Sequence, residues 1–337
     1  MFDTLDLEKI FKNFNNLKIL VIGDVMIDSY MWGKVRRISP EAPVPVISGI
    51  IKETRLGGAA NVALNIKAMG AVPILCSVIG DDQRGKEFLK LLRNQKLTDL
   101  GIMVEKNRQT TRKTRVISGN QHLLRIDEET NEMISRESEE QLLTFISRFI
   151  NEKSINVVIF QDYDKGVITE NIVKEIITLA NKKKIPVLVD PKKRNFLLYE
   201  KVSLFKPNFK ELNEGLKAEL DKHDLESLAG AIEYLRQLKK HKMVMLTLSE
   251  LGIMINQDGQ YHHIAAEIRD IADVSGAGDT VISIAGLCLG AGISALDTAL
   301  LANLAGGQVC EKTGVVPVNK EQLLEEALIL KSEDPGN

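Results

Sequence analysis

Short apolar runs, each followed by polar residues, recur along the chain and constrain its fold more than any other feature. The first, KILVI, ends just before Gly23 and Asp24, and the others cover residues 73–79, 156–160, 185–189, 202–205 and 243–248. Apolar runs of this length are typical of strands that are buried on both faces, as in parallel sheets. Amphipathic stretches between them, such as residues 86–94 and 137–151, predict helices. We therefore expect an α/β fold with a mostly parallel central sheet and helices on both faces.

Residues 31–55 break this pattern, because they alternate, contain three prolines and show no helical period. Pro43 and Pro45 lack the N–H that a central strand needs, so they favour an edge strand or an exposed ribbon. Residues 113–127 are also rich in strand-forming side chains and can pair with that ribbon. We expect the two excursions, about residues 30–52 and 105–127, to form a small β lid on a single domain covering residues 1–337.

The composition is that of an ordinary soluble protein and argues against several partners. A formal net charge of -2, with no dense block of Lys and Arg, predicts no nucleic-acid partner. The apolar region 281–310 is interrupted by glycines and polar residues, which favours two buried helices over a membrane span. The N-terminal stretch carries acidic residues, unlike a signal peptide, and the 3 cysteines lie far apart, as reduced core thiols do. We expect a cytoplasmic protein.

Two glycine-rich turns precede predicted helices. In the first, Gly57 and Gly58 permit close backbone approach, and Asn61 in the first helical turn either caps the helix or binds a ligand hydroxyl. The second, DVSGAGDT at residues 273–280, begins a helix whose free N–H groups and dipole suit an anion. Its Asp279 is either an N-terminal acid favoured by the dipole or a group that does chemistry beside the anion.

Polar residues at other strand ends leave similar alternatives open. Asp24 and Asp28 are well placed for a polar ligand, or they are turn-forming and capping acids. Asn208 and Glu211 stand three apart at a helix start, as a helix cap does, and the same pair can hold a hydrated magnesium ion beside a nucleotide. Arginines on the lid either are solvated or clamp a phosphate.

Several familiar motifs are excluded. GDDQRGK at residues 80–86 is close to a P-loop, but Glu87 stands where the magnesium-binding Ser or Thr is needed. The dinucleotide fingerprint fails because Val281 occupies the place of its third glycine, and no G-x-S-x-G elbow occurs. The five histidines show no metal-ligand spacing.

The two glycine-rich turns, far apart and with Asn208 and Glu211 between them, resemble the ribokinase (PfkB) family of sugar kinases over about residues 17–330. Further stretches resemble the kinase domain of the heptose kinases in that family. They are VIGDVMIDSY (21–30), RISPEAPVPV (37–46), KTR (113–115), LLRID (123–127) and DYDKG (162–166). The sequence departs from the expected pattern at His122, where we expect Gln, and in the basic run 192–194, which leaves the exact sugar open.

The resemblance implies transfer of phosphate from ATP, with Mg²⁺, to the anomeric hydroxyl of D-glycero-β-D-manno-heptose 7-phosphate, giving the 1,7-bisphosphate for ADP-heptose and lipopolysaccharide core. Many family members carry a second, adenylyltransferase domain with an H-x-G-H motif; that motif does not occur here, so we expect a kinase-only chain. The alternatives are another sugar kinase of the family, or a catalytically silent nucleotide-binding protein.

The resemblance also implies a role for each candidate residue. Asp279 is the general base, and the N–H groups of Gly276, Ala277 and Gly278 form the anion hole. Sugar hydroxyls are expected at Asp24, Asp28, Gly57, Gly58 and Asn61, and the substrate phosphate at Arg36, Arg37, Lys113 and Arg115. ATP is expected along Asn208, Phe209, Lys210, Glu211, Thr247, Ser249, Gly252 and Asn303, with the metal at Asn208 and Glu211. We expect a homodimer formed through the lid.

Overall fold

The computed structural model describes residues 2, 6–119, 121–152 and 154–333. Its main sheet has nine strands in the order β13-β12-β11-β10-β9-β8-β1-β4-β5. All neighbours from β11 to β5 run parallel, and only β12 and β13 join antiparallel. The bounds are β1 Lys18–Gly23, β4 Val72–Gly80, β5 Ile102–Glu105, β8 Val157–Gln161, β9 Val187–Asp190, β10 Leu204–Phe205, β11 Met243–Thr247, β12 Ile253–Gln257 and β13 Gln260–Ile264.

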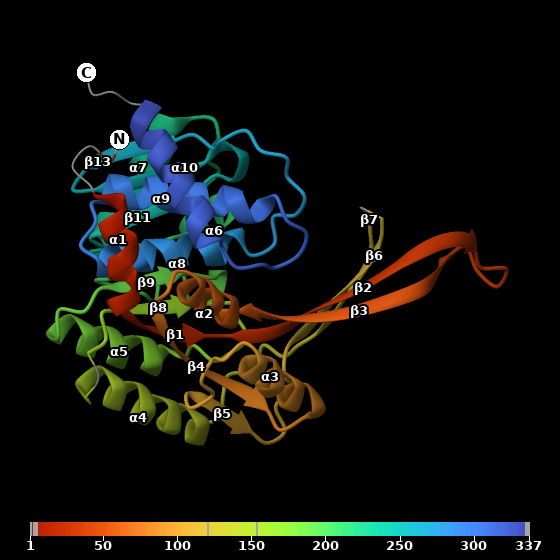
Figure 1. Ribbon diagram of the computed structural model, residues 1–337. Helices are drawn as coiled ribbons and strands as arrows, with labels where there is room; N and C mark the ends of the chain where they lie inside the picture. The colour runs from red at the N-terminus through yellow and green to blue at the C-terminus, as the bar shows by residue number, and fades with distance from the viewer. Residues whose placement is uncertain (1, 3–5, 120, 153, 334–337) are drawn as a thin grey trace.

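Helices cover both faces of this sheet because successive strand side chains point to opposite sides. In β1, Ile19 and Val21 enter one core and Leu20 and Ile22 the other, and all four are fully buried. Figure 1 shows α2 and α8 on one side of β1 and β8, and α4 and α5 on the other. The first core is closed by α1 Leu7–Asn13, α2 Ala59–Ala68, α3 Gln83–Asn94, α8 Ala277–Gly290, α9 Ala295–Cys310 and α10 Lys320–Glu333; the second by α4 Arg136–Glu152, α5 Glu170–Lys182, α6 Phe209–Leu216 and α7 Leu225–Lys239. The predicted fold class is confirmed.

The β lid is a separate sheet of four strands in the order β3-β2-β6-β7. Its strands are β2 Val25–Ile38, β3 Pro45–Gly58, β6 Arg112–Ser118 and β7 Gln121–Glu128. The β2–β3 hairpin extends well away from the body of the molecule (Figure 1). Both predicted excursions therefore contribute, and Pro45 lies on an edge strand as expected. Residue 120, inside the second excursion, lies outside the described residues.

The structure corrects the lid's bounds. β2 starts at Val25, directly after Asp24, and β3 ends at Gly58, so the first excursion is longer than the predicted 30–52. Asp28 is consequently a strand residue of the lid and not a turn acid. Glu105, where the second excursion was expected to begin, is the last residue of β5 in the main sheet.

Local capping explains another difference. α3 begins at Gln83, three residues before the predicted start, because the side chain of Asp82 accepts the N–H of Gly85 at 2.6 Å and caps the helix. The P-loop-like stretch is thus a strand end followed by a cap. The three cysteines are free and buried, as expected. None of the described helices combines the length and apolar character that a membrane span requires.

Gly23→Ala tests how closely β1 and β8 approach beside the site. A Cβ on Gly23 would lie 1.9 Å from the backbone oxygen of Gln161, its partner across the parallel ladder, and backbone yields little. We expect this substitution to lower the free energy of unfolding by roughly 3 kcal/mol or more, measured by urea denaturation. Gly230→Ala is the matched control, because a Cβ there meets nothing within 4 Å in α7 and Ala favours a helix. Equal stability of the two variants would contradict the close approach.

Candidate active site

The N-terminus of α8 forms the floor of the candidate site. Gly276, with φ of 84°, turns the chain into the helix, and no side chain caps this end. The first N–H groups of a helix have no internal partner, and the dipole makes this end positive. The N–H of Ala277 donates to the carbonyl of Val274 at 3.3 Å, and the anion-hole role of Gly276, Ala277 and Gly278 stays a prediction.

Asp279 lies in the first turn of α8 and is 3% exposed. Its Oδ2 accepts a hydrogen bond from Nδ2 of Asn61 at 2.9 Å, and its Oδ1 accepts one from the hydroxyl of Tyr163 at 2.7 Å. Burial raises the pKa of Asp279 to about 7, although both hydrogen bonds act to lower it. Asn61 is therefore no helix cap but a donor to this carboxylate, and Asp279 is a buried proton acceptor with a near-neutral pKa.

Positive charge lies beside the same helix end. Lys206 is 2% exposed, and its Nζ lies 3.0 Å from Oδ2 of Asp190. A Cβ on Gly278 would lie 3.6 Å from that Nζ, so the ammonium group borders the first turn of α8. Lys192 pairs with Glu211, and its Nζ lies 5.5 Å from the ring centroid of Tyr163. Each ammonium group is already paired with a carboxylate, so these lysines and the helix N-terminus offer donors to a phosphate group within a site of mixed charge.

Asp24 follows β1 and is almost fully buried. Its carboxylate accepts three backbone N–H groups of the loop after β8: Tyr163 at 2.8 Å, Lys165 at 3.2 Å and Val167 at 3.0 Å. Burial raises its pKa, and these bonds oppose the rise. In this structure Asp24 holds the loop that carries Tyr163, and its contact with a sugar hydroxyl stays a prediction.

Asp28, in β2, forms a buried ion pair with Arg115 of β6. The guanidinium of Arg115 lies 5.4 Å from the ring centroid of Tyr30. A Cβ on Gly57 would overlap Oδ2 of Asp28 at 2.0 Å, so glycine is what lets this carboxylate approach the backbone. Gly58 has φ of 61° and is the residue directly before α2, which it joins to β3. These predicted substrate residues are brought together at the base of the lid.

The other predicted lid cations lie in two different parts of the lid. Lys113 is at the lid base, where its Nζ lies 3.9 Å from Oε2 of Glu129, and burial lowers the pKa of Lys113. Arg36 and Arg37 are exposed, and they stand eight and nine residues beyond Asp28 in β2, roughly 25 Å along the strand. The structure does not bring these two arginines together with Asp279 of the same chain.

Asn208 and Glu211 form a capping box at the start of α6. Asn208 Oδ1 accepts the N–H of Glu211 at 2.9 Å, and Glu211 Oε2 accepts the N–H of Asn208 at 2.9 Å. The helix-cap interpretation is confirmed, and the metal role stays a prediction. Among the described residues, no group of three His, Cys, Asp or Glu side chains is arranged to hold a metal ion. Phe209 and Lys210 begin the same helix.

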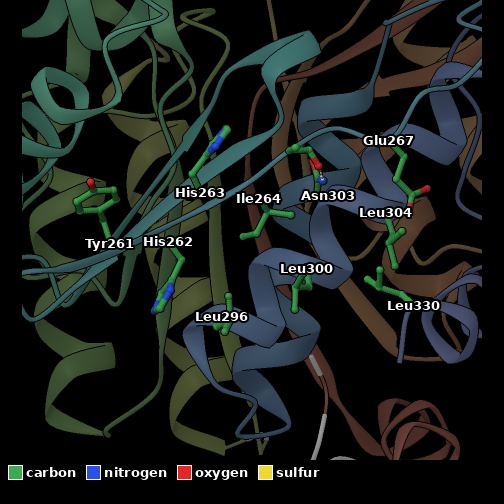
Figure 2. A pocket seen from close by; sticks show the side chains of 11 residues that line it. Tyr261, His262, His263, Ile264, Glu267, Leu296, Leu300, Asn303, Leu304 and Leu330 are labelled. Carbon is green, nitrogen blue, oxygen red and sulfur yellow. Dashed lines mark hydrogen bonds between the residues drawn. The ribbon is translucent and has the colours of Figure 1, made fainter. Parts of the chain in front are cut away.

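The remaining predicted nucleotide residues lie in two places. Thr247 ends β11 and forms a bridge with Asn208, and the loop that follows contains Ser249 and Gly252, both with positive φ. Asn303 lies in α9 and donates to the carbonyl of Ala265 at 2.8 Å. It lines a cavity of about 490 Å³ between β13 and α9, where Figure 2 shows it near Leu304 and Leu300. That volume is within the usual range for small-ligand sites.

Sequence reasoning missed Tyr163, Asp190, Lys206 and the link from Lys192 to Glu211. The signals were present, since DYDKG and the basic run 192–194 both stood out. Neither stretch could be linked to Asp279 from sequence, because Tyr163 and Asp279 lie 116 residues apart. Only the packing of β8 and β9 against α8 brings them together.

Comparison with known proteins matches residues 16–322 to the family described as pfkB family carbohydrate kinase. The chain is 40% identical over 318 residues to the "Bifunctional protein HldE" of Helicobacter pylori (strain G27), covering 94% of this chain and 67% of that protein. It is 37% identical to the protein of the same name from Geobacter sulfurreducens, covering 95% of this chain and 64% of that one. The chain thus spans about two thirds of the length of these relatives.

Solved structures show the same fold. Phosphofructokinase-2 from Escherichia coli, in complex with potassium, superposes with a TM-score of 0.76 at 17% identity, covering 94% of this chain and 99% of that one. Arabidopsis thaliana ribokinase, complexed with ribose and ATP, gives a TM-score of 0.69 at 17% identity, covering 92% and 98%.

The raised pKa of Asp279 predicts a pH-dependent cost to stability. The folded value of about 7 exceeds the ordinary 3.8, so between these values the folded state binds the proton more tightly than the unfolded chain. Stability therefore falls as pH rises through that window and is constant above it. From pH 5 to pH 8, we expect Asp279→Asn to gain about 3 kcal/mol in unfolding free energy relative to wild type, because two pH units lie below the folded pKa; the measurement is urea denaturation. Asp258→Asn, on an exposed turn, is the control, and parallel pH curves for Asp279→Asn and wild type would contradict the prediction.

Proposed function

Since the chain belongs to the pfkB family of carbohydrate kinases, we propose that it transfers the γ-phosphoryl group of ATP to the anomeric C1 hydroxyl of D-glycero-β-D-manno-heptose 7-phosphate. The product would be heptose 1,7-bisphosphate, for ADP-heptose and lipopolysaccharide core. The observation that carries the proposal is the buried Asp279 carboxylate at the N-terminus of α8, with Lys206 beside it. The sugar is supported by the heptose-kinase motifs and by the likeness to HldE proteins.

In this reaction Asp279 removes the proton of the C1 hydroxyl while the C1 oxygen of the sugar bonds to the γ-phosphorus. The bond from that phosphorus to the bridging oxygen breaks, and ADP leaves with that oxygen. A base with a pKa of about 7 suits this task near neutral pH. The transferred group carries negative charge on its equatorial oxygens. First-turn amides of α8 and the ammonium group of Lys206 lie where they can stabilise that charge.

Magnesium would be held by Asn208 and Glu211, whose oxygen donors suit a hard cation. The side-chain oxygens of Asn208 and Glu211 already accept hydrogen bonds in the capping box and from Lys192. They therefore suit a magnesium ion that keeps most of its own water ligands. When bound, the ion neutralises charge on the β- and γ-phosphates. Thr247, Ser249, Gly252 and Asn303 would border the rest of the nucleotide, with Asn303 beside its 490 Å³ cavity.

The substrate would lie between the main sheet and the lid. Asp28, Gly57, Gly58 and Asn61 would contact its hydroxyls, and Lys113 and Arg115 at the lid base would contact the 7-phosphate. Arg36 and Arg37 lie too far along β2 to act in the same site, so their phosphate role requires the lid to move or a second chain to meet it.

The lid also carries the surface that we propose for a homodimer. Several of its large apolar side chains are exposed, including Ile51 at 69%, Ile38 at 59% and Leu124 at 57%. Its outer strands β3 and β7 have one neighbour each within the lid sheet. Covering these edges and side chains with a second copy would remove apolar surface from water.

The activity is tested by ADP release with ATP, magnesium and the heptose 7-phosphate, beside fructose 6-phosphate and ribose. We expect turnover with the heptose phosphate alone. Asp279→Asn should lower kcat by about 10²–10⁴-fold, because the base is lost. Asp258→Asn makes the same chemical change on an exposed turn and should retain full activity. Turnover with a control sugar only would make the sugar assignment wrong, and ATP binding without any turnover would favour a silent nucleotide binder.

The dimer is tested by Ile51→Glu, with light scattering after gel filtration. We expect wild type to be a dimer and the variant to dissociate at least tenfold more readily, because a buried unpaired charge costs several kcal/mol. Tyr234→Glu is the control, since Tyr234 is comparably exposed, at 59%, on α7 outside the lid. A monomeric wild type, or an unchanged variant, would rule out this interface.

A further inference from the structure

The carboxylate of Asp279 receives one hydrogen bond on each oxygen, and the two donors come from different parts of the chain. Asn61 belongs to α2, whereas Tyr163 belongs to the loop after β8. A carboxylate held at both oxygens cannot rotate without breaking one of these bonds. The donor bond from Tyr163 is the shorter, at 2.7 Å against 2.9 Å.

The loop that carries Tyr163 is fixed by two buried acids. Asp24 accepts the N–H of Tyr163 and of two further loop residues. Asp162, directly before Tyr163, accepts the hydroxyl of Tyr199 at 3.0 Å and Nδ2 of Asn195 at 2.9 Å. Burying two carboxylates is costly, so this arrangement indicates that the position of the loop matters.

We propose that Tyr163 is a positioning residue for the kinase reaction, whose hydroxyl fixes the orientation of the Asp279 carboxylate. The inference rests on the proposed function only in taking Asp279 as the base. With Asn61 and Tyr163 bound, the lone pairs that remain on Asp279 have fixed directions toward an incoming hydroxyl. A fixed base needs no reorientation in the transition state.

The sign of the effect on proton affinity follows from the donor. A hydrogen bond to a carboxylate stabilises its charged form, so removing the Tyr163 hydroxyl raises the pKa of Asp279. The other charged groups that face Asp279 are Asp190, which raises its pKa, Lys206, which lowers it, and Lys192 beyond the Tyr163 ring. Tyr163→Phe leaves all three in place. Burial holds the pKa of Tyr163 itself well above 10, so the phenol remains a neutral donor at assay pH.

The test is the pH profile of kcat/KM for Tyr163→Phe. This variant keeps the ring beneath Lys192 and removes only the hydroxyl. We expect kcat at pH 7 to fall about tenfold, with KM for ATP unchanged. The acid limb, the part of the profile where kcat/KM rises with pH as Asp279 loses its proton, should move up by about one pH unit. The phosphate of the substrate also ionises in this range, with a pKa of about 6, but its contribution is the same for both enzymes.

Tyr234→Phe is the control, because it removes a hydroxyl from an exposed tyrosine on α7 that contacts neither Asp279 nor the loop after β8. We expect it to leave both the stability and the acid limb where they are. Should Tyr163→Phe fail to fold, judged by ATP binding, site-specific 3-fluorotyrosine at position 163 provides a second variant. Its more acidic phenol is a stronger donor, so the acid limb should move to lower pH.

An unmoved acid limb in both position-163 variants would overturn the inference. A large rise in KM for the sugar without a shift of the limb would overturn it too, since Tyr163 would then be a substrate ligand. The assay uses whichever sugar phosphate the wild type phosphorylates best. A wild type that prefers fructose 6-phosphate overturns the proposed sugar and leaves this test intact, whereas a fully active Asp279→Asn overturns both proposals.

Discussion

The structure of the site depends on one unfavourable fact, the burial of the Asp279 carboxyl group. Removing a carboxylate from water costs free energy unless donors replace the lost solvent. Here the replacement comes from Asn61 of α2 and Tyr163 of the loop after β8, while α8 supplies its positive end. The loop after β8 and the start of α2 are both fixed beside the end of β1, because Asp24 accepts N–H groups of that loop through its carboxylate and the N–H of Ala59 through its carbonyl. The parallel sheet is therefore what makes a buried base possible.

Two further buried acids, Asp24 and Asp162, lie around the loop that carries Tyr163. Asp24 and Asp162 are buried acids whose pKa values burial raises, to about 6 for Asp162, and each is surrounded by donors. Neither touches Asp279, yet together they fix the loop that presents Tyr163 to it. Clusters of acids with raised pKa values are common at functional sites, where stability is exchanged for reactivity. In this chain the exchange involves three carboxyl groups at the edge of one sheet.

Much of this was predictable from sequence, and the limits are instructive. Apolar runs predict the central strands, because a strand buried on both faces has apolar residues at successive positions. The two glycine-rich turns drew attention to Asn61 and Asp279, because a tight turn before a helix needs glycine. The Tyr163 contact has no local mark, since a tyrosine after a strand is chemically ordinary until β8 is placed beside α8. Asn208 and Glu211 show the opposite limit: their spacing fits a capping box and a metal site equally, and the observed hydrogen bonds establish the cap alone.

The proposed base and most of the proposed sugar contacts come from different parts of the fold. Asp279, Tyr163 and Lys206 all come from the main sheet and its helices, whereas Asp28, Gly57 and Arg115 belong to the lid strands. The lid base is anchored to the body, because Tyr30 accepts the N–H of Val315 at 3.0 Å and Arg55 donates to the carbonyls of Thr313 and Val315. Lid residues near this anchor are thus held against the body of the molecule, whereas the far end of the β2–β3 ribbon extends away from it (Figure 1). Under the proposed function, the lid strands would contact the sugar while the main sheet and its helices hold the base, so a substitution in the lid would change sugar contacts without moving Asp279.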